Sequence, residues 1–230
     1  MPGIGAFDRV MANPPFSEKV WGYDVWSNGD PFGRDIYGVP PKGYGDLAFV
    51  QHMVASLKDD GMLGVVVPHG VLFRGGTEGR IRQAMLEADI IDAVIGLAPN
   101  LFYGAGIPAA ILIIRKNKPA ERQGKVLVVN GDDTFQQGKA QNHLTDANVR
   151  TLADAFSDFA DVEKLARVVP VEEVEANGFN LNISRYVQTG ADTEIVDVTV
   201  EVAKLRDLIA ARDEAETVMF GHLKRLGYVG

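Results

Sequence analysis

The sequence predicts an α/β fold with a mixed sheet, followed by C-terminal helices. Up to residue 130, short apolar runs alternate with amphipathic segments of helical period, which is the pattern of strands packed against helices. The apolar runs at 90–97 and 109–114 are joined by a linker too short for a parallel crossover, so we expect them to pair antiparallel. Beyond residue 195, apolar residues recur at heptad spacing, which predicts helix.

The first strand is expected at residues 7–12 and ends at Asn13. Pro14 and Pro15 exclude both a helix and a central strand, and each restricts the residue before it to extended conformations. Residues 17–45 are rich in glycine, proline and aromatic residues, which predicts a long irregular loop. Loops of this length inside compact domains are usually functional or disordered.

A helix is expected at residues 47–58, with Asp46 as its N-cap and residues 59–61 (DDG) as its end. The β-branched run at 62–67 predicts a strand that is covered on both faces of a mainly parallel sheet. A glycine-containing loop and a second helix at 77–87 follow. Residues 125–130 predict one more strand, 131–165 a polar loop with a mostly helical stretch, and 180–186 an extended connector.

The composition excludes several classes of protein. The chain has 230 residues, a formal charge of −8 and no cysteine, and its four histidines lack metal-ligand spacing. Neither a disulfide framework nor a metal site is therefore expected. No apolar run is long enough to span a bilayer, and the first residues do not resemble a signal peptide, so we expect a cytoplasmic protein without membrane contact. The acidic charge argues against this chain holding a nucleic-acid duplex alone.

The tetrapeptide at Asn13 carries the clearest chemistry. Ligands of open α/β sheets bind beyond the carboxyl ends of the strands, where Asn13 stands. Its side-chain oxygen and the Pro14 carbonyl can both accept hydrogen bonds from one exocyclic amino group, which would aim the nitrogen lone pair at a methyl donor. The ring of Phe16 can stack on a base that has left the duplex, a contact worth about 1–3 kcal/mol. The alternative is a plain turn, with Phe16 a core aromatic.

Six further residues are candidates for a base pocket: Phe32, Tyr37, Tyr44, Asp46, His69 and Arg74. Each has a structural alternative. The aromatic rings can pack the loop down, Asp46 can cap its helix, and His69 has no identifiable carboxylate partner. Arg74 and the two glycines after it can present N–H groups to a phosphate at a helix start, or can simply form a turn.

The stretch Asn13-Pro14-Pro15-Phe16 resembles the catalytic motif of amino-methyltransferases, (Asn/Asp/Ser)-Pro-Pro-(Tyr/Phe). Four other stretches are similar, in the same order, to the modification subunit of type I restriction-modification systems, a family of N6-adenine DNA methyltransferases. They are residues 43–52 (GYGDLAFVQH), 67–76 (VPHGVLFRGG), 91–108 (IDAVIGLAPNLFY through IP) and 180–187 (NLNISRYV).

This resemblance implies a partial class I (Rossmann-like) methyltransferase fold. Residues 1–130 would be the C-terminal half of the catalytic domain, 131–187 a family-specific extension and 188–230 a C-terminal amphipathic helical segment. The resemblance also implies Asn13, Pro14, Pro15 and Phe16 as catalytic residues, S-adenosylmethionine as methyl donor and adenine N6 in DNA as acceptor. The implied partners are a specificity subunit that reads the DNA, contacted through helices at 195–226, and a restriction subunit.

The family's cofactor motif is a glycine-rich turn, Asp-Pro-x-x-Gly-Ser-Gly, upstream of the catalytic motif. Only six residues precede the expected catalytic strand, and they contain no such turn. We therefore expect a truncated methyltransferase subunit that is inactive alone. Two alternatives remain, namely a non-catalytic module that docks on a specificity subunit, and a methyltransferase that acts on RNA or on a protein glutamine.

Overall fold

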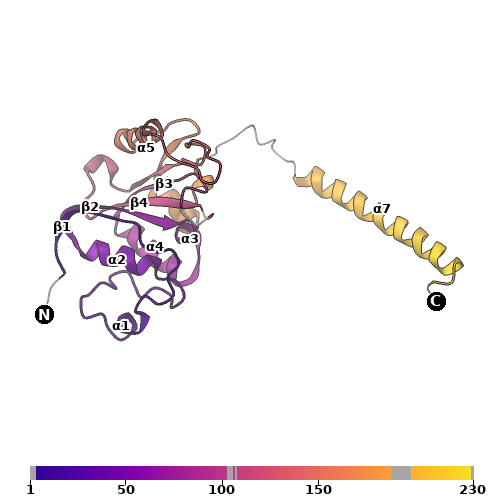
Figure 1. Ribbon diagram of the computed structural model, residues 1–230, viewed down its shortest axis with the longest axis horizontal. Helices are drawn as coiled ribbons and strands as arrows, with labels where there is room; N and C mark the ends of the chain where they lie inside the picture. The colour runs from indigo at the N-terminus through magenta and orange to yellow at the C-terminus, as the bar shows by residue number, and fades with distance from the viewer. Residues whose placement is uncertain (1–3, 103–105, 107, 188–197, 229–230) are drawn as a thin grey trace. The chain divides into compact units, whose positions relative to one another are not determined.

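The computed structural model describes residues 4–102, 106, 108–187 and 198–228 (Figure 1). Residues 103–105 and 107, within the third family-like stretch, and residues 195–197, at the start of the expected helical segment, lie outside the described residues. The chain divides into two compact units, Met1–Thr189 and Gly190–Gly230, and each is described by itself.

The first unit is built on a mixed sheet. Its described strands are β1 (Phe7–Ala12), β2 (Leu57–Pro68), β3 (Ile91–Gly96), β4 (Ala109–Arg115), β5 (Lys125–Val129) and β6 (Ala166–Pro170). Their order across the sheet is β1-β2-β4-β3-β5-β6. Strands β1 and β2 pair in parallel, as do β3 and β5, whereas the β2–β4, β3–β4 and β5–β6 pairs are antiparallel. The α/β class, the mixed sheet and the antiparallel β3–β4 pair are confirmed, but the sheet is not mainly parallel.

Helices cover the two faces of the sheet unequally. Helices α2 (Asp46–Ala55), α3 (Gly70–Phe73) and α4 (Gly76–Glu87) lie on one side, and α5 (Asp146–Asp158) lies on the other (Figure 1). The larger core cluster joins apolar residues of α2 and α4 to the strands β2, β4 and β3. A smaller cluster joins α5 to β3 and β5. The remaining short helices are α1 (Tyr23–Ser27), in the long loop after β1, and α6 (Val171–Ala176), after β6.

The second face is therefore partly open over β1 and β2. Along β2 the fully buried Leu63, Val65 and Val67 alternate with residues that are only partly buried. On β1, the side chain of Met11 is 89% exposed. The expectation that residues 62–67 are covered on both faces is wrong for the described residues, because α5 packs over β3 and β5 rather than over this end of the sheet.

The boundary between α2 and β2 also differs from the expected one. The helix ends at Ala55 and β2 begins at Leu57, so that residues 59–61 belong to the strand and do not terminate the helix. Leu57 is buried and pairs with Phe7 of β1, and these contacts outweigh the helical periodicity of the segment. A Cβ on Gly61 would lie 3.0 Å or less from the backbone oxygens of Lys58 and Phe7, so this irregular crossing requires glycine.

Two further expectations are corrected. The N-cap of α2 is Gly45, and the side chain of Asp46 makes no capping hydrogen bond. Strand β6 was not expected, and it extends the sheet by pairing with β5. The helical stretch expected within 131–165 is confirmed as α5, which Thr145 starts with a reciprocal capping box to Asn148.

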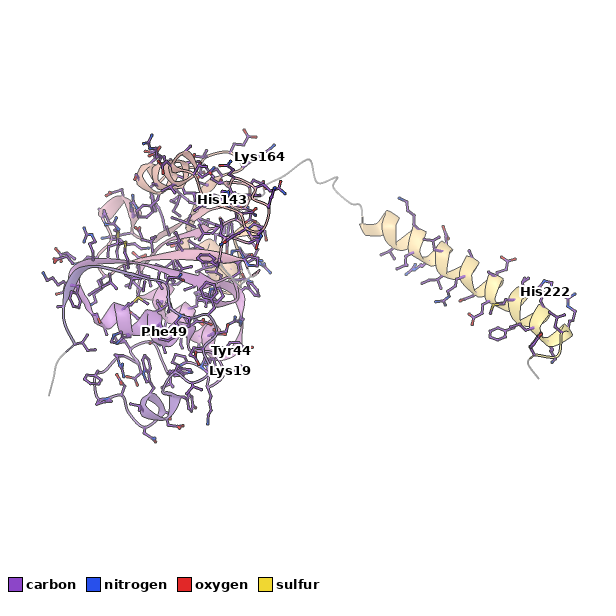
Figure 2. All side chains as sticks on the ribbon, viewed as in Figure 1. Lys19, Tyr44, Phe49, His143, Lys164 and His222 are labelled. Carbon is purple, nitrogen blue, oxygen red and sulfur yellow. The ribbon has the colours of Figure 1, made fainter. Side chains whose placement is uncertain are left out.

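The second unit contains helix α7 (Val198–Arg225). Its described side chains are exposed, with Leu223 the one partly buried, and they project from all sides of the helix, His222 among them (Figure 2). On this helix Arg212 donates a hydrogen bond from its Nε to Oδ1 of Asp213 at 3.0 Å. Within the described parts of the chain, no helix combines the length and the apolar character that crossing a membrane requires.

Candidate active site at the carboxyl edge of the sheet

The ends of several strands meet at one edge of the sheet. Because β1 and β2 run in parallel, Asn13 and His69, which follow them, emerge at the same edge. Strand β4 runs the other way, so its first residue, Ala109, lies at this edge and pairs with Pro68. This is the edge at which open α/β sheets bind ligands.

The tetrapeptide presents an accessible amide beside a pair of aromatic rings. Asn13 is exposed, while Pro14 and Phe16 are partly buried. The ring of Phe16 meets the ring of Phe102 at 5.7 Å between centroids and at 73°, an edge-to-face contact. Phe102 comes from the loop after β3 and was not among the expected site residues, although it lies in the third family-like stretch. The position of Asn13 after β1 agrees with the sequence-based expectation.

Three of the candidate pocket residues lie together behind the tetrapeptide. Asp46 accepts a hydrogen bond from the backbone N–H of Ser17 at 2.7 Å. Its other carboxylate oxygen lies 3.5 Å from Nη1 of Arg74, which also bonds Glu78 at 3.0 and 3.2 Å. The Arg74 guanidinium lies over the Tyr44 ring, 4.4 Å from its centroid. Tyr44 itself is labelled in Figure 2.

Two carboxylates share Arg74, and the charge of Arg82 also acts on Glu78. Burial raises the pKa of Glu78, and the nearby Arg74 acts in the opposite direction. Arg74 lies within an ion-pair cluster, in which its Nη1 faces both Asp46 and Glu78.

His69 lines a separate cleft of about 470 Å³ at the same edge. Its Nε2 lies 3.1 Å from the carbonyl oxygen of Ala109, and since a carbonyl can only accept, Nε2 carries the proton. Burial lowers the pKa of His69, and Asp132 across the cleft opposes that effect. Asp132, whose pKa is raised by burial, is thus the carboxylate neighbour that the sequence did not reveal.

Phe32 and Tyr37 also belong to the long loop, but they make different contacts from those of Tyr44, Asp46 and Arg74. Arg34 bonds Asp30 and places its guanidinium 5.1 Å from the centroid of Phe32, which is 42% exposed. Tyr37 packs against the larger core cluster, and its backbone N–H donates to the side chain of Gln51 at 2.9 Å. No cluster of ligating side chains suited to a metal ion occurs among residues that the structure describes.

Comparisons with known proteins identify related sequences and folds. The model of the N-6 DNA Methylase family matches residues 2–194. The type I restriction enzyme MjaVIII methylase subunit of Methanocaldococcus jannaschii is 35% identical over 229 residues, which cover 97% of this chain and 39% of that protein. The HindI methylase subunit of Haemophilus influenzae is 30% identical over 234 residues, or 96% of this chain and 52% of that protein.

A solved structure agrees with these matches. The type I restriction-modification methyltransferase subunit from Streptococcus thermophilus superposes with a TM-score of 0.74 at 39% identity, covering 82% of this chain and 39% of that one. This chain thus corresponds to about half or less of each of these relatives. The family model spans most of the chain, including the tetrapeptide after β1, and on this evidence the chain belongs to the N-6 DNA methylase family.

Proposed function

We propose that this chain is the acceptor half of an adenine-N6 DNA methyltransferase subunit of a type I restriction-modification system. The observation that carries the proposal is the exposed Asn13 at the carboxyl end of β1, next to the Phe16–Phe102 ring pair. An amide acceptor beside aromatic rings suits a flat base that bears an exocyclic amino group.

In this proposal the Asn13 side-chain oxygen and the Pro14 carbonyl accept the two hydrogens of the adenine amino group. The nitrogen lone pair then points away from both acceptors, toward the methyl donor. The two prolines limit the conformations of this turn, so the geometry is set before the base arrives. Phe16 stacks on the base, and Phe102 forms the adjoining wall. Positioning of this kind, with no metal required, is the contribution of the chain to catalysis.

The other candidate residues take different proposed roles. Tyr44, Asp46 and Arg74 lie behind the tetrapeptide and support it. His69 is a proposed contact for the extruded nucleotide, from the cleft that it shares with Asp132. Phe32 and Tyr37 remain proposed pocket residues, which would need the long loop to rearrange when DNA binds.

S-adenosylmethionine is the proposed methyl donor. Strand β1 is an edge strand of the described sheet, with β2 as its neighbour, and the sequence of Ile4–Ala6 before it does not match the glycine-rich turn expected for this cofactor. We propose that the donor site belongs to polypeptide outside this chain, on the open side of β1. The relatives are long enough to hold such a segment, since this chain covers 39% of the M. jannaschii protein.

Isothermal titration tests this division of labour. The isolated chain should not bind S-adenosylmethionine with micromolar affinity. The completed subunit, meaning this chain joined to the upstream part of a type I methylase subunit such as the S. thermophilus relative, should bind it. Micromolar binding to the isolated chain would contradict the proposal, and so would failure of the folded, completed subunit to bind.

The proposed partners are a specificity subunit, through which DNA is engaged, and a restriction subunit. A net charge of −8 suits a chain that leaves the grip on the duplex to another protein. The docking element would be α7, where apolar residues at heptad spacing are exposed, including Leu205, Ile209 and Met219. Exposed apolar stripes of this kind mark contact surfaces. Because its substrate would be chromosomal DNA, the proposed location is the cytoplasm.

A charge placed in the apolar stripe of α7 should weaken docking strongly. Ile209→Asp combined with Met219→Asp is expected to raise the dissociation constant for a specificity subunit at least about 100-fold, since each buried apolar side chain contributes about 1.5–3 kcal/mol. Asp207→Lys changes a charge on the opposite face and should alter binding less than about threefold. Equal effects of the two changes, measured by calorimetry, would rule out the stripe as the contact. This docking role is also what the non-catalytic alternative would retain.

A further inference from the structure

The chain that leaves the catalytic tetrapeptide is tied to the start of α2. Ser17, directly after Phe16, donates its backbone N–H to Oδ1 of Asp46 at 2.7 Å. The next residue, Glu18, accepts a hydrogen bond from the backbone N–H of Gly45 at 2.9 Å. Two consecutive residues beyond the tetrapeptide are thus held by the two residues that begin the helix.

Ser17 needs such a restraint because of its backbone. Its φ is +53°, in the left-handed region that a residue with a side chain rarely adopts. The two prolines restrain the tetrapeptide from within, but they do not constrain Ser17, which follows Phe16. The Asp46 carboxylate fixes the direction of the chain at this point, just beyond Phe16.

Asp46 is itself held in place and shielded from water. Its side chain is 2% exposed, and its second oxygen faces Arg74. Arg74 is held in turn by Glu78 on α4 and by the ring of Tyr44. Hydrogen bonds that involve a charged group are stronger than those between neutral groups. Since α2 packs on β2 through the larger core cluster, the restraint on Ser17 is anchored in the core of the unit.

We propose that Asp46 is a positioning residue, which holds the Asn13–Phe16 turn in its reactive geometry through the Ser17 amide, with Arg74 fixing its carboxylate. This inference rests on the proposed function of the tetrapeptide. It assigns Asp46 a role other than contact with the base, because one of its oxygens accepts the Ser17 N–H and the other faces Arg74. Asp46 is the first residue of α2 and Gly45 is the N-cap, so the Asp46 carboxylate has no capping role to fill.

The test compares Asp46→Ala, which removes the acceptor, with Asp46→Asn, which keeps an oxygen that can accept the Ser17 N–H. Asp59→Ala is the matched control, because Asp59 is exposed on β2. Two quantities are measured: the hydrogen-exchange rate of the Ser17 amide in the full 230-residue chain, and kcat and KM for methyl transfer to DNA by the completed subunit together with a specificity subunit. Thermal unfolding checks that each variant is folded.

Asp46→Ala should accelerate exchange at Ser17 at least about 10-fold and lower kcat about 100-fold, with KM for S-adenosylmethionine changed less than about threefold. Asp46→Asn should retain slow exchange and stay within about 10-fold of the unsubstituted kcat. Asp59→Ala should change neither quantity.

The proposal is overturned if Asp46→Ala accelerates exchange but leaves kcat unchanged, because Asp46 would then serve stability alone. It is also overturned if exchange at Ser17 stays slow in Asp46→Ala, or if Asp46→Asn behaves like Asp46→Ala in both measurements. Failure of the proposed function has a different signature: the unsubstituted completed subunit, together with a specificity subunit, would not transfer methyl groups, while the exchange measurement would still report whether Asp46 holds Ser17.

Discussion

Replacing Asp92 by alanine is expected to lower the free energy of unfolding by about 3–5 kcal/mol, a large part of the stability of a typical domain. The Asp92 side chain is fully buried in β3. It stands at a bulge, where Ile91 and Ala93 pair with the adjacent Ile114 and Ile113 of β4. A bulge turns a side chain away from the regular alternation of the strand.

This orientation brings Asp92 to two guanidinium groups. Its Oδ2 accepts from Nε of Arg115 at 2.8 Å and from Nη1 of Arg122 at 3.1 Å. Arg122 also donates to the carbonyls of Phe156 and Ser157 and lies over the Phe156 ring, so Asp92 indirectly fastens the end of α5. Without the Asp92 carboxylate, the buried guanidinium of Arg122 has no counterion among the residues named above. An unpaired buried charge of this kind strongly lowers the free energy of unfolding.

Urea unfolding followed by circular dichroism measures the effect. The exposed Asp59→Ala should change stability by less than about 0.5 kcal/mol. The double variant Asp92→Ala/Arg122→Met should recover part of the loss, because it removes the uncompensated charge, and it keeps the test informative if the single variant does not fold. A loss below about 1 kcal/mol for Asp92→Ala would contradict this account of the cluster.

The second large effect is expected at Asn13. In the completed subunit assayed together with a specificity subunit, Asn13→Ala should lower kcat on the order of 10³-fold, or about 4 kcal/mol, because the transition state loses one of the two acceptors for the amino group. KM for DNA should change little, since the amide contributes mainly in the transition state. Asn13 is exposed, so the substitution should leave the unfolding midpoint in place.

Matched variants separate this effect from a general one. Asn117→Ala removes an exposed amide in the turn after β4 and should leave kcat unchanged. Asn13→Asp keeps an acceptor oxygen and should retain more activity than Asn13→Ala. A kcat for Asn13→Ala within about tenfold of the unsubstituted subunit would refute the proposed role of this side chain.

Much of the fold was predictable because local pattern and tertiary structure agree. The β3–β4 pairing followed from a linker too short for a parallel crossover, and α4 and β5 followed from periodicity and β-branching. Where the two disagreed, distant contacts prevailed. Leu57 departs from the helical pattern because it is buried and pairs with Phe7 of β1. Asp46 is the first residue of α2 and not its N-cap, and its carboxylate accepts the backbone N–H of Ser17.

The candidate site was predictable to a smaller extent. Two prolines after an apolar strand predicted the position of Asn13 directly after β1. The contact between Phe16 and Phe102, and the approach of Asp132 to His69, join segments far apart in the chain, and no periodicity encodes them. The available signal for Phe102 was its place in a loop between two buried strands at the same edge of the sheet.

The central claim is that Asn13 and its neighbours receive the amino group of adenine in DNA. Its most direct test is the product formed when the completed subunit and a specificity subunit are incubated with methyl-labelled S-adenosylmethionine and duplex DNA. After digestion to nucleosides, the label should appear as N6-methyl-2′-deoxyadenosine, and Asn13→Ala should lower its rate of formation on the order of 10³-fold. Label on cytosine, transfer to RNA or protein in place of DNA, or no transfer by the folded, cofactor-bound assembly would contradict the claim.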